Sequence, residues 1–169
     1  MSQNLVLIGF MGVGKGTVAR ALVRKSGMFG LDSDDLIESI ENRKVKTIFE
    51  EDGEEYFRAM EKKTAKWLST SVTNTIISTG GGFFKVDKLN SIGKVIYLKS
   101  SFDGIIDRLK AEPNAEQKFN KRPLLKNMEK AKALFDERAP LYEAKADIII
   151  NVEQQNLNTI IDNILEEIK

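Results

Sequence analysis

The chain has 169 residues, with 26 basic and 25 acidic side chains and a formal net charge of +1. This length predicts one domain, and the balanced charge offers no basic excess for binding nucleic acid. Because cysteine and histidine are absent, disulfides, thiolate or imidazole metal sites and a Ser-His-Asp triad are excluded. Without a basic leader or a membrane-length apolar run, we expect a cytoplasmic protein that contacts no membrane.

Apolar runs and helical patterns alternate along the chain. In its first half they predict a strand at 5–10, a helix from 15 to about 25, a strand ending near 32, a helix over DSDDLIESIE, and a helix over 53–69 that buries Phe57, Met60, Thr64, Trp67 and Leu68. In its second half they predict strands at 74–79, 94–100 and 147–152, and helices at about 102–110, 128–143 and from 157 onward. Asp35 and Glu38 have the spacing of a capping box for the second helix.

This alternation predicts an α/β fold with three layers and a five-stranded, mostly parallel sheet. In such folds ligands bind beyond the carboxyl ends of the strands. The polar stretch at about 112–124 has no periodicity and contains Pro113 and Pro123, which predicts a mobile lid. Residues 1–169 are therefore expected to form a single domain, with an acceptor-binding region at about 33–61.

A phosphate-binding loop is predicted where the first strand meets the first helix. The stretch GFMGVGKGT has the Gly-x₄-Gly-Lys spacing, and its nucleotide-binding residues are Gly12, Val13, Gly14, Lys15, Gly16 and Thr17. Glycines let backbone N–H groups point at phosphate oxygens, and the helix N-terminus adds positive potential. The alternative is a tight glycine turn with a solvated Lys15. Gly16 stands where a magnesium-binding Ser or Thr is usual.

In combination, GFMGVGKGT, LDSDDLIE, EEYFRAME, STGGG, KRPLL and ERAPLYEAKAD resemble the shikimate kinases over nearly the whole chain. The resemblance implies a P-loop kinase fold and transfer of the γ-phosphoryl group of ATP to the 3-hydroxyl of shikimate, with Mg²⁺. It also implies a role in aromatic amino-acid biosynthesis. We expect a monomer, although the sequence leaves the oligomeric state open. Because Gly-Lys-Gly-Thr is similar to the loop of adenylate kinases, we expect Mg²⁺ to be held largely through water.

The resemblance also implies roles for acidic residues and glycines. Asp32 and Ser78 would contact the metal through water, and Asp34 would bind the acceptor hydroxyl and act as base. An aspartate is the natural base in a chain without histidine, although such residues also commonly cap helices, as we expect of Asp35. Gly80, Gly81 and Gly82 would lie against the substrate; the alternative is a flexible loop.

Four arginines complete the predicted site. Arg58 and Arg138 resemble the pair that grips the shikimate carboxylate, with Glu61 orienting Arg58. The alternative for Arg58 is a solvated pair with Glu61. Arg122, beside Lys121 in the lid, resembles the arginine that stabilises developing charge and is expected to be catalytic with Lys15 and Asp34. Arg108 is expected near adenine.

Val45, Phe49 and Phe57 form either an apolar wall of the acceptor pocket or ordinary core. Two other functions stay open from the sequence. One is another small-acceptor kinase, for nucleoside monophosphates or gluconate, which Gly16 favours. The other is a non-catalytic ATP-binding module. The paired arginines and DSDD fit a carboxylated polyol better than a nucleotide acceptor.

Overall fold

The computed structural model describes residues 3–169 and has at its centre a five-stranded parallel sheet in the order β2-β3-β1-β4-β5. Its strands are β1 (Leu5–Ile8), β2 (Phe29–Asp32), β3 (Thr75–Ser78), β4 (Lys94–Lys99) and β5 (Ile148–Asn151). β1 and β3 are buried throughout, as continuous apolar runs predict for central parallel strands covered on both faces. The predicted α/β fold with a five-stranded parallel sheet is confirmed.

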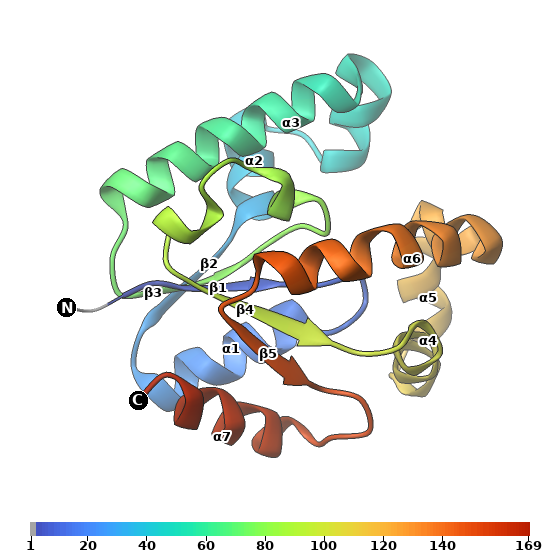
Figure 1. Ribbon diagram of the computed structural model, residues 1–169. Coiled ribbons are helices and arrows are strands. Elements are labelled where there is room, and N and C mark those ends of the chain that lie inside the picture. Colours follow the sequence, from blue (N-terminus) through green and yellow to red (C-terminus); the bar gives the residue numbers. More distant parts are fainter. Residues whose placement is uncertain (1–2) are drawn as a thin grey trace.

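Helices cover both faces of this sheet (Figure 1), as the three-layer prediction requires. On one face lie α1 (Lys15–Ser26) and α7 (Leu157–Glu167), and on the other lie α3 (Val45–Ser71) and α6 (Met128–Lys145). The remaining helical elements are α2 (Ser33–Glu41), α4 (Phe102–Ala111), α5 (Ala115–Asn120), and the 3₁₀ turns η1 (Phe83–Lys85), η2 (Leu89–Ser91) and η3 (Pro123–Lys126).

The helix predicted over 53–69 is longer and broken. α3 begins at Val45, and Gly53 interrupts it with φ 83° and ψ 174°, values that favour glycine. The prediction that Trp67 is buried is wrong, since 47% of the residue is exposed. The buried arc also takes in Glu61 and Ala65, which moves its centre away from Trp67.

The expected capping by Asp35 is also wrong. Asp32 is the N-cap of α2, and its Oδ1 accepts hydrogen bonds from the backbone N–H groups of Asp34 at 2.9 Å and Asp35 at 3.1 Å. Glu38 Oε1 instead accepts from the N–H of Val45 at 3.0 Å, at the start of α3. The helix begins one residue after the strand ends, so the cap falls on the last strand residue.

The stretch predicted as a lid, 112–124, contains α5 and the beginning of η3. α5 buries none of its residues, so its sequence has no apolar periodicity that could have predicted a helix. The Glu112 carboxylate anchors this segment through ion pairs with Arg108 at 2.9 Å and with Lys118. Among residues 3–169, none of the helices has both the length and the apolar character required to cross a bilayer.

Candidate active site

The turn between β1 and α1 has the backbone shape of a phosphate-binding loop. Gly12 and Gly14 have φ of 82° and 107°, so both need the left-handed region that glycine enters without strain. Lys15 opens α1 and is buried, and its Nζ donates to the carbonyl oxygens of Gly9 at 2.6 Å and Phe10 at 3.2 Å. The predicted loop thus places a buried cation at the carboxyl end of the central strand.

Lys15 and Asp34 influence each other's titration across the crevice. Burial lowers the pKa of Lys15 to about 8, although the charges of Asp34 and Asp32 oppose this shift. Burial raises the pKa of Asp34 to about 7; Asp32 and Glu61 add to the shift, and Lys15 opposes it. A carboxylate that titrates near neutral pH beside a cation is typical of a general base.

Parallel register brings the acidic motif beside the glycine-rich one. Asp32 at the end of β2 pairs with Ser78 at the end of β3. Asp34 follows in the first turn of α2, and its Oδ1 is buried without a hydrogen-bond partner in the described part of the chain. A buried carboxylate oxygen without a hydrogen-bond partner destabilises the folded state unless a bound ligand donates a hydrogen bond to it.

Each glycine of the 80–82 stretch lies against a different side chain predicted to bind the acceptor. A Cβ on Gly80 would lie 2.6 Å from Asp34 Oδ1, and one on Gly82 would lie 2.3 Å from Arg58 Nη1. A Cβ on Gly81 would lie 3.4 Å from Arg138 Nη1, in ordinary contact. Gly80 and Gly82 therefore let the backbone approach Asp34 and Arg58 more closely than a side chain would allow, which the flexible-loop alternative does not explain.

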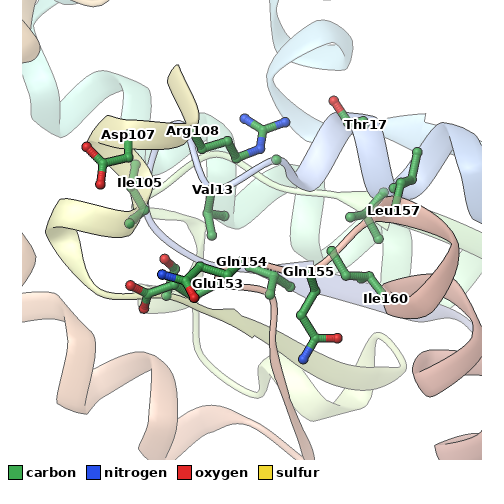
Figure 2. A pocket seen from close by; sticks show the side chains of 15 residues that line it. Val13, Thr17, Ile105, Asp107, Arg108, Glu153, Gln154, Gln155, Leu157 and Ile160 are labelled. Atoms are coloured by element: carbon green, nitrogen blue, oxygen red, sulfur yellow. The ribbon is translucent and has the colours of Figure 1, made fainter. Parts of the chain in front are cut away.

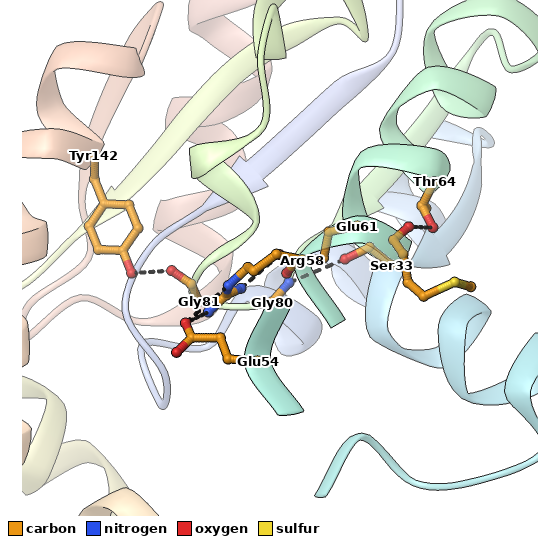
Figure 3. Close-up of polar contacts among 9 residues, drawn as sticks. Ser33, Glu54, Arg58, Glu61, Thr64, Gly80, Gly81 and Tyr142 are labelled. Atoms are coloured by element: carbon orange, nitrogen blue, oxygen red, sulfur yellow. Dashed lines mark hydrogen bonds and ion pairs between the residues drawn. The ribbon is translucent and has the colours of Figure 1, made fainter. Parts of the chain in front are cut away.

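Arg138 and Tyr142 extend this cluster from α6. Arg138 is 8% exposed, and its Nε has no hydrogen-bond partner among the described residues. The Tyr142 hydroxyl donates to the carbonyl of Gly81 at 2.6 Å, as Figure 3 shows. Sequence reasoning missed Tyr142; its four-residue spacing from Arg138 on a helix is the signal that could have suggested a shared face.

Val45, Phe49 and Phe57 lie together in a second, smaller apolar cluster. Phe57 is buried with Ile37, Ile48 and Met60, and Val45 and Phe49 pack against them. The Phe49 and Phe57 rings are 4.8 Å apart between centroids. These contacts fit ordinary core, and the predicted role as a pocket wall stays a prediction.

A cavity of about 300 Å³ borders the phosphate loop (Figure 2). Its lining includes none of the residues predicted to bind the acceptor. Val13, Gly14 and Thr17 of the loop and α1, Arg108 of α4, and the 152–155 segment after β5 contribute to its lining. Arg108 Nη1 donates to the carbonyl of Gly12 at 3.0 Å. The sequence drew no attention to residues 152–155; their place after the carboxyl end of a strand is the signal that could have found them.

Arg122 lies in the segment predicted as a lid, directly before η3. Its Nη1 donates to the carbonyl of Lys118 at 3.1 Å. Burial lowers the pKa of Arg122, with Glu112 opposing and Arg108 adding to the shift. The charge of Arg122 also contributes to the lowered pKa of Lys15.

The chain matches a family model described as "Shikimate kinase" over residues 11–169. It is 40% identical to shikimate kinase from Helicobacter hepaticus over 149 residues, covering 88% of this chain and 86% of the relative. It is 39% identical to shikimate kinase from Sulfurihydrogenibium sp. over 172 residues, covering 99% and 98%.

Solved structures of shikimate kinases are also similar to this chain. The structure titled "Shikimate kinase from Acinetobacter baumannii in complex with shikimate" has a TM-score of 0.84 and 30% identity, covering 99% of this chain and 93% of that one. A gluconokinase from Sinorhizobium meliloti 1021 has a TM-score of 0.56 and 14% identity, covering 98% and 90%, and shares the fold alone.

A phosphate-binding loop on a parallel sheet, facing a buried carboxylate and paired arginines, defines a small-molecule kinase of the P-loop class. The family match extends that assignment to nearly the whole chain. The chain belongs to the shikimate kinase family and is an ATP-dependent kinase.

Proposed function

We propose that Asp34 accepts the proton of the shikimate 3-hydroxyl while the γ-phosphoryl group of ATP is transferred to that oxygen. The observation that carries this assignment is the buried, unpartnered Oδ1 of Asp34, which lies against Gly80. Phosphoryl transfer needs a positioned hydroxyl and a proton acceptor. A pKa of about 7 leaves Asp34 able to take a proton near neutral pH.

Arg58 and Arg138 are proposed to bind the shikimate carboxylate. Both are held against the glycine stretch, and Arg58 Nη1 donates to Glu61 Oε2 at 2.7 Å. The Glu61 side chain is 2% exposed, so this pair is not the solvated one that the alternative requires. A fixed guanidinium can bind a carboxylate through two parallel hydrogen bonds.

Gly82→Ala tests this arrangement. The new methyl group would lie 2.3 Å from Arg58 Nη1, so the guanidinium must move. We expect KM for shikimate to rise by roughly tenfold and KM for ATP to stay unchanged, since misplacing a binding group by about 1 Å is costly. Gly81→Ala is the matched control, because its methyl group makes an ordinary contact at 3.4 Å. Equal effects from both variants would contradict the proposed role of Arg58.

On the nucleotide side, we propose that residues 12–17, which include Lys15, bind the phosphates. Lys15 would exchange its bonds to loop carbonyls for phosphate oxygens. The cavity beside Arg108 and the 152–155 segment is proposed to take the adenine ring. Arg122 would stabilise charge on the transferred group when the 112–124 lid closes.

Mg²⁺ is proposed to bind through water near Asp32 and Ser78. The donor chemistry fits: the Asp32 and Ser78 positions pair at the sheet edge, Asp32 uses only Oδ1 for capping, and Asp34 is adjacent. Mg²⁺ often keeps several water ligands in phosphate sites, so water and phosphate oxygens would complete its shell. When bound, the ion neutralises charge on the β- and γ-phosphates.

Gly16→Ser is expected to move half-saturation to a modestly lower Mg²⁺ concentration, because it offers a direct hydroxyl ligand in place of water. Its Cβ would lie 3.2 Å from Arg20 Nη1, at the end of a flexible side chain that can shift. Activity of both proteins is titrated against free Mg²⁺, and Mg²⁺-dependent ADP binding supplies a second readout. A wild type that needs no Mg²⁺ would contradict the proposed metal site.

An ADP-release assay with shikimate, gluconate and AMP as alternative acceptors tests the proposed function. Of the three acceptors, we expect only shikimate to give ADP release above the background. Turnover only with gluconate or AMP would favour another small-acceptor kinase, and ATP binding without turnover would favour the non-catalytic module. The monomeric state, the cytoplasmic location and the single domain stay predictions.

A further inference from the structure

The Arg58 guanidinium contacts two carboxylates of different character (Figure 3). Its Nη1 donates to Glu61 Oε2 at 2.7 Å, and the Glu61 side chain is 2% exposed. Its Nε and Nη2 both donate to a single oxygen of Glu54, at 3.3 Å and 3.2 Å, and the Glu54 side chain is 61% exposed. Glu61 is therefore a buried anchor, whereas Glu54 is a loosely bound surface partner.

The edge that Glu54 contacts is one that suits a carboxylate ligand. Nε and Nη2 of arginine present two parallel N–H groups, which match the two oxygens of a carboxylate. Glu54 offers one oxygen to both groups at long distances, so this pairing is incomplete. A ligand carboxylate with both oxygens in place would bind the same edge more strongly.

There is room for such an exchange. Arg58 and Glu54 both line a cavity of about 550 Å³, together with Glu55, Glu61, Lys62, Lys85 and Val86. Glu54 directly follows the break at Gly53, and it meets Arg58 one helical turn later. Its exposed side chain can turn toward solvent without breaking any buried contact.

We propose that Glu54 competes with the acceptor carboxylate for the Nε/Nη2 edge of Arg58. This inference rests on the proposed binding of shikimate by Arg58. Glu54 stays paired with the guanidinium until the carboxylate of an acceptor displaces it. An acceptor without a carboxylate cannot displace Glu54 in this way. Glu54 thus contributes to acceptor selectivity at the expense of acceptor affinity.

The test measures KM and kcat for shikimate in the full-length wild type, Glu54→Gln and Glu54→Ala. We expect both variants to lower KM by about two- to fivefold, the range that a partly exposed ion pair supports, with kcat nearly unchanged. The carboxamide analogue of shikimate should show no such gain. Glu55→Gln is the matched control, because it removes the same charge from the same cavity and Glu55 has no ion pair with Arg58 in the described residues.

The possible results separate this inference from the proposed function. A raised KM in both Glu54 variants would make Glu54 a positioning residue for Arg58 and overturn the proposal. An unchanged KM, or an equal gain from Glu55→Gln, would also overturn it. A wild type that does not phosphorylate shikimate would refute the proposed function and this inference together. Thermal transitions of all variants verify that they are folded.

Discussion

Asp34→Asn should keep ATP binding intact while lowering turnover with shikimate by about 10²–10⁴-fold, the usual effect of losing a general base. Asparagine has nearly the same shape as aspartate, so it preserves the contact with Gly80 but cannot accept the proton. Turnover is measured by ADP release, and nucleotide affinity by titration with ADP. Near-normal turnover would remove Asp34 from the proposed mechanism.

Asp34→Asn should also change the pH dependence of stability. A variant that loses turnover but is more stable than the wild type at high pH has not lost turnover through misfolding. Burial raises the pKa of Asp34 from 3.8 to about 7, so between these pH values the folded state holds a proton that the unfolded state has lost. The wild type therefore loses stability as pH rises through this window. Asp34→Asn should melt at a higher temperature than the wild type at pH 8, with the difference vanishing toward pH 4. A lower melting temperature at pH 8 would contradict the buried charge.

Arg58→Lys should raise KM for shikimate by about tenfold or more and leave KM for ATP unchanged. Lysine keeps the positive charge but loses the planar fork that can bind Glu61 and an acceptor carboxylate together. Steady-state kinetics with each substrate varied in turn provides the measurement.

Arg43→Lys is the matched control. Arg43 also uses its fork to bind carboxylates, those of Glu41 at 2.8 Å and Glu51 at 2.7 Å, but it does not line the cavity beside Arg58. It should leave KM for shikimate unchanged. If the two variants behave alike, or if Arg58→Lys leaves KM unchanged, Arg58 is only a structural ion pair.

The elements that the sequence predicted well are those in which local pattern and burial agree. Continuous apolar runs identify β1 and β4 because helices cover both faces of the central sheet. The register of the sheet depends on contacts between distant segments, so the pairing of Asp32 with Ser78 could not be read from local pattern. It follows from the topology once β2 and β3 are neighbours.

The errors have local physical causes. Gly53 can be read either as the beginning of a helix or as a break inside one, and only its φ of 83° in the structure distinguishes the two. Trp67 fits a helical stripe by spacing, but the buried stripe of α3 also includes Glu61 and Ala65, so its centre lies away from Trp67. A buried glutamate is not expected from hydrophobic patterning, because its burial depends on the charge of Arg58.

The candidate site could be predicted in part because its residues belong to short motifs. Lys15, Asp34 and the three glycines follow strands, and parallel strands bring those positions to one edge. The 152–155 segment carries no comparable motif, so its place in the cavity near Arg108 emerges only from the folded chain. Tyr142 belongs to the ERAPLYEAKAD stretch, but its contact with Gly81 depends on how α6 packs over the glycines. The competition between Glu54 and an acceptor likewise depends on side-chain geometry.

Identifying the reaction product tests the proposed phosphorylation of shikimate most directly. The wild type is incubated with ATP, Mg²⁺ and shikimate, and the product is analysed by phosphorus and proton NMR, with Asp34→Asn run in parallel. We expect the wild type to give one new phosphate ester, coupled to the proton on carbon 3 of shikimate, and the variant to give almost none. A phosphate on another hydroxyl, or no phosphorylated shikimate from the wild type, would contradict the proposed reaction.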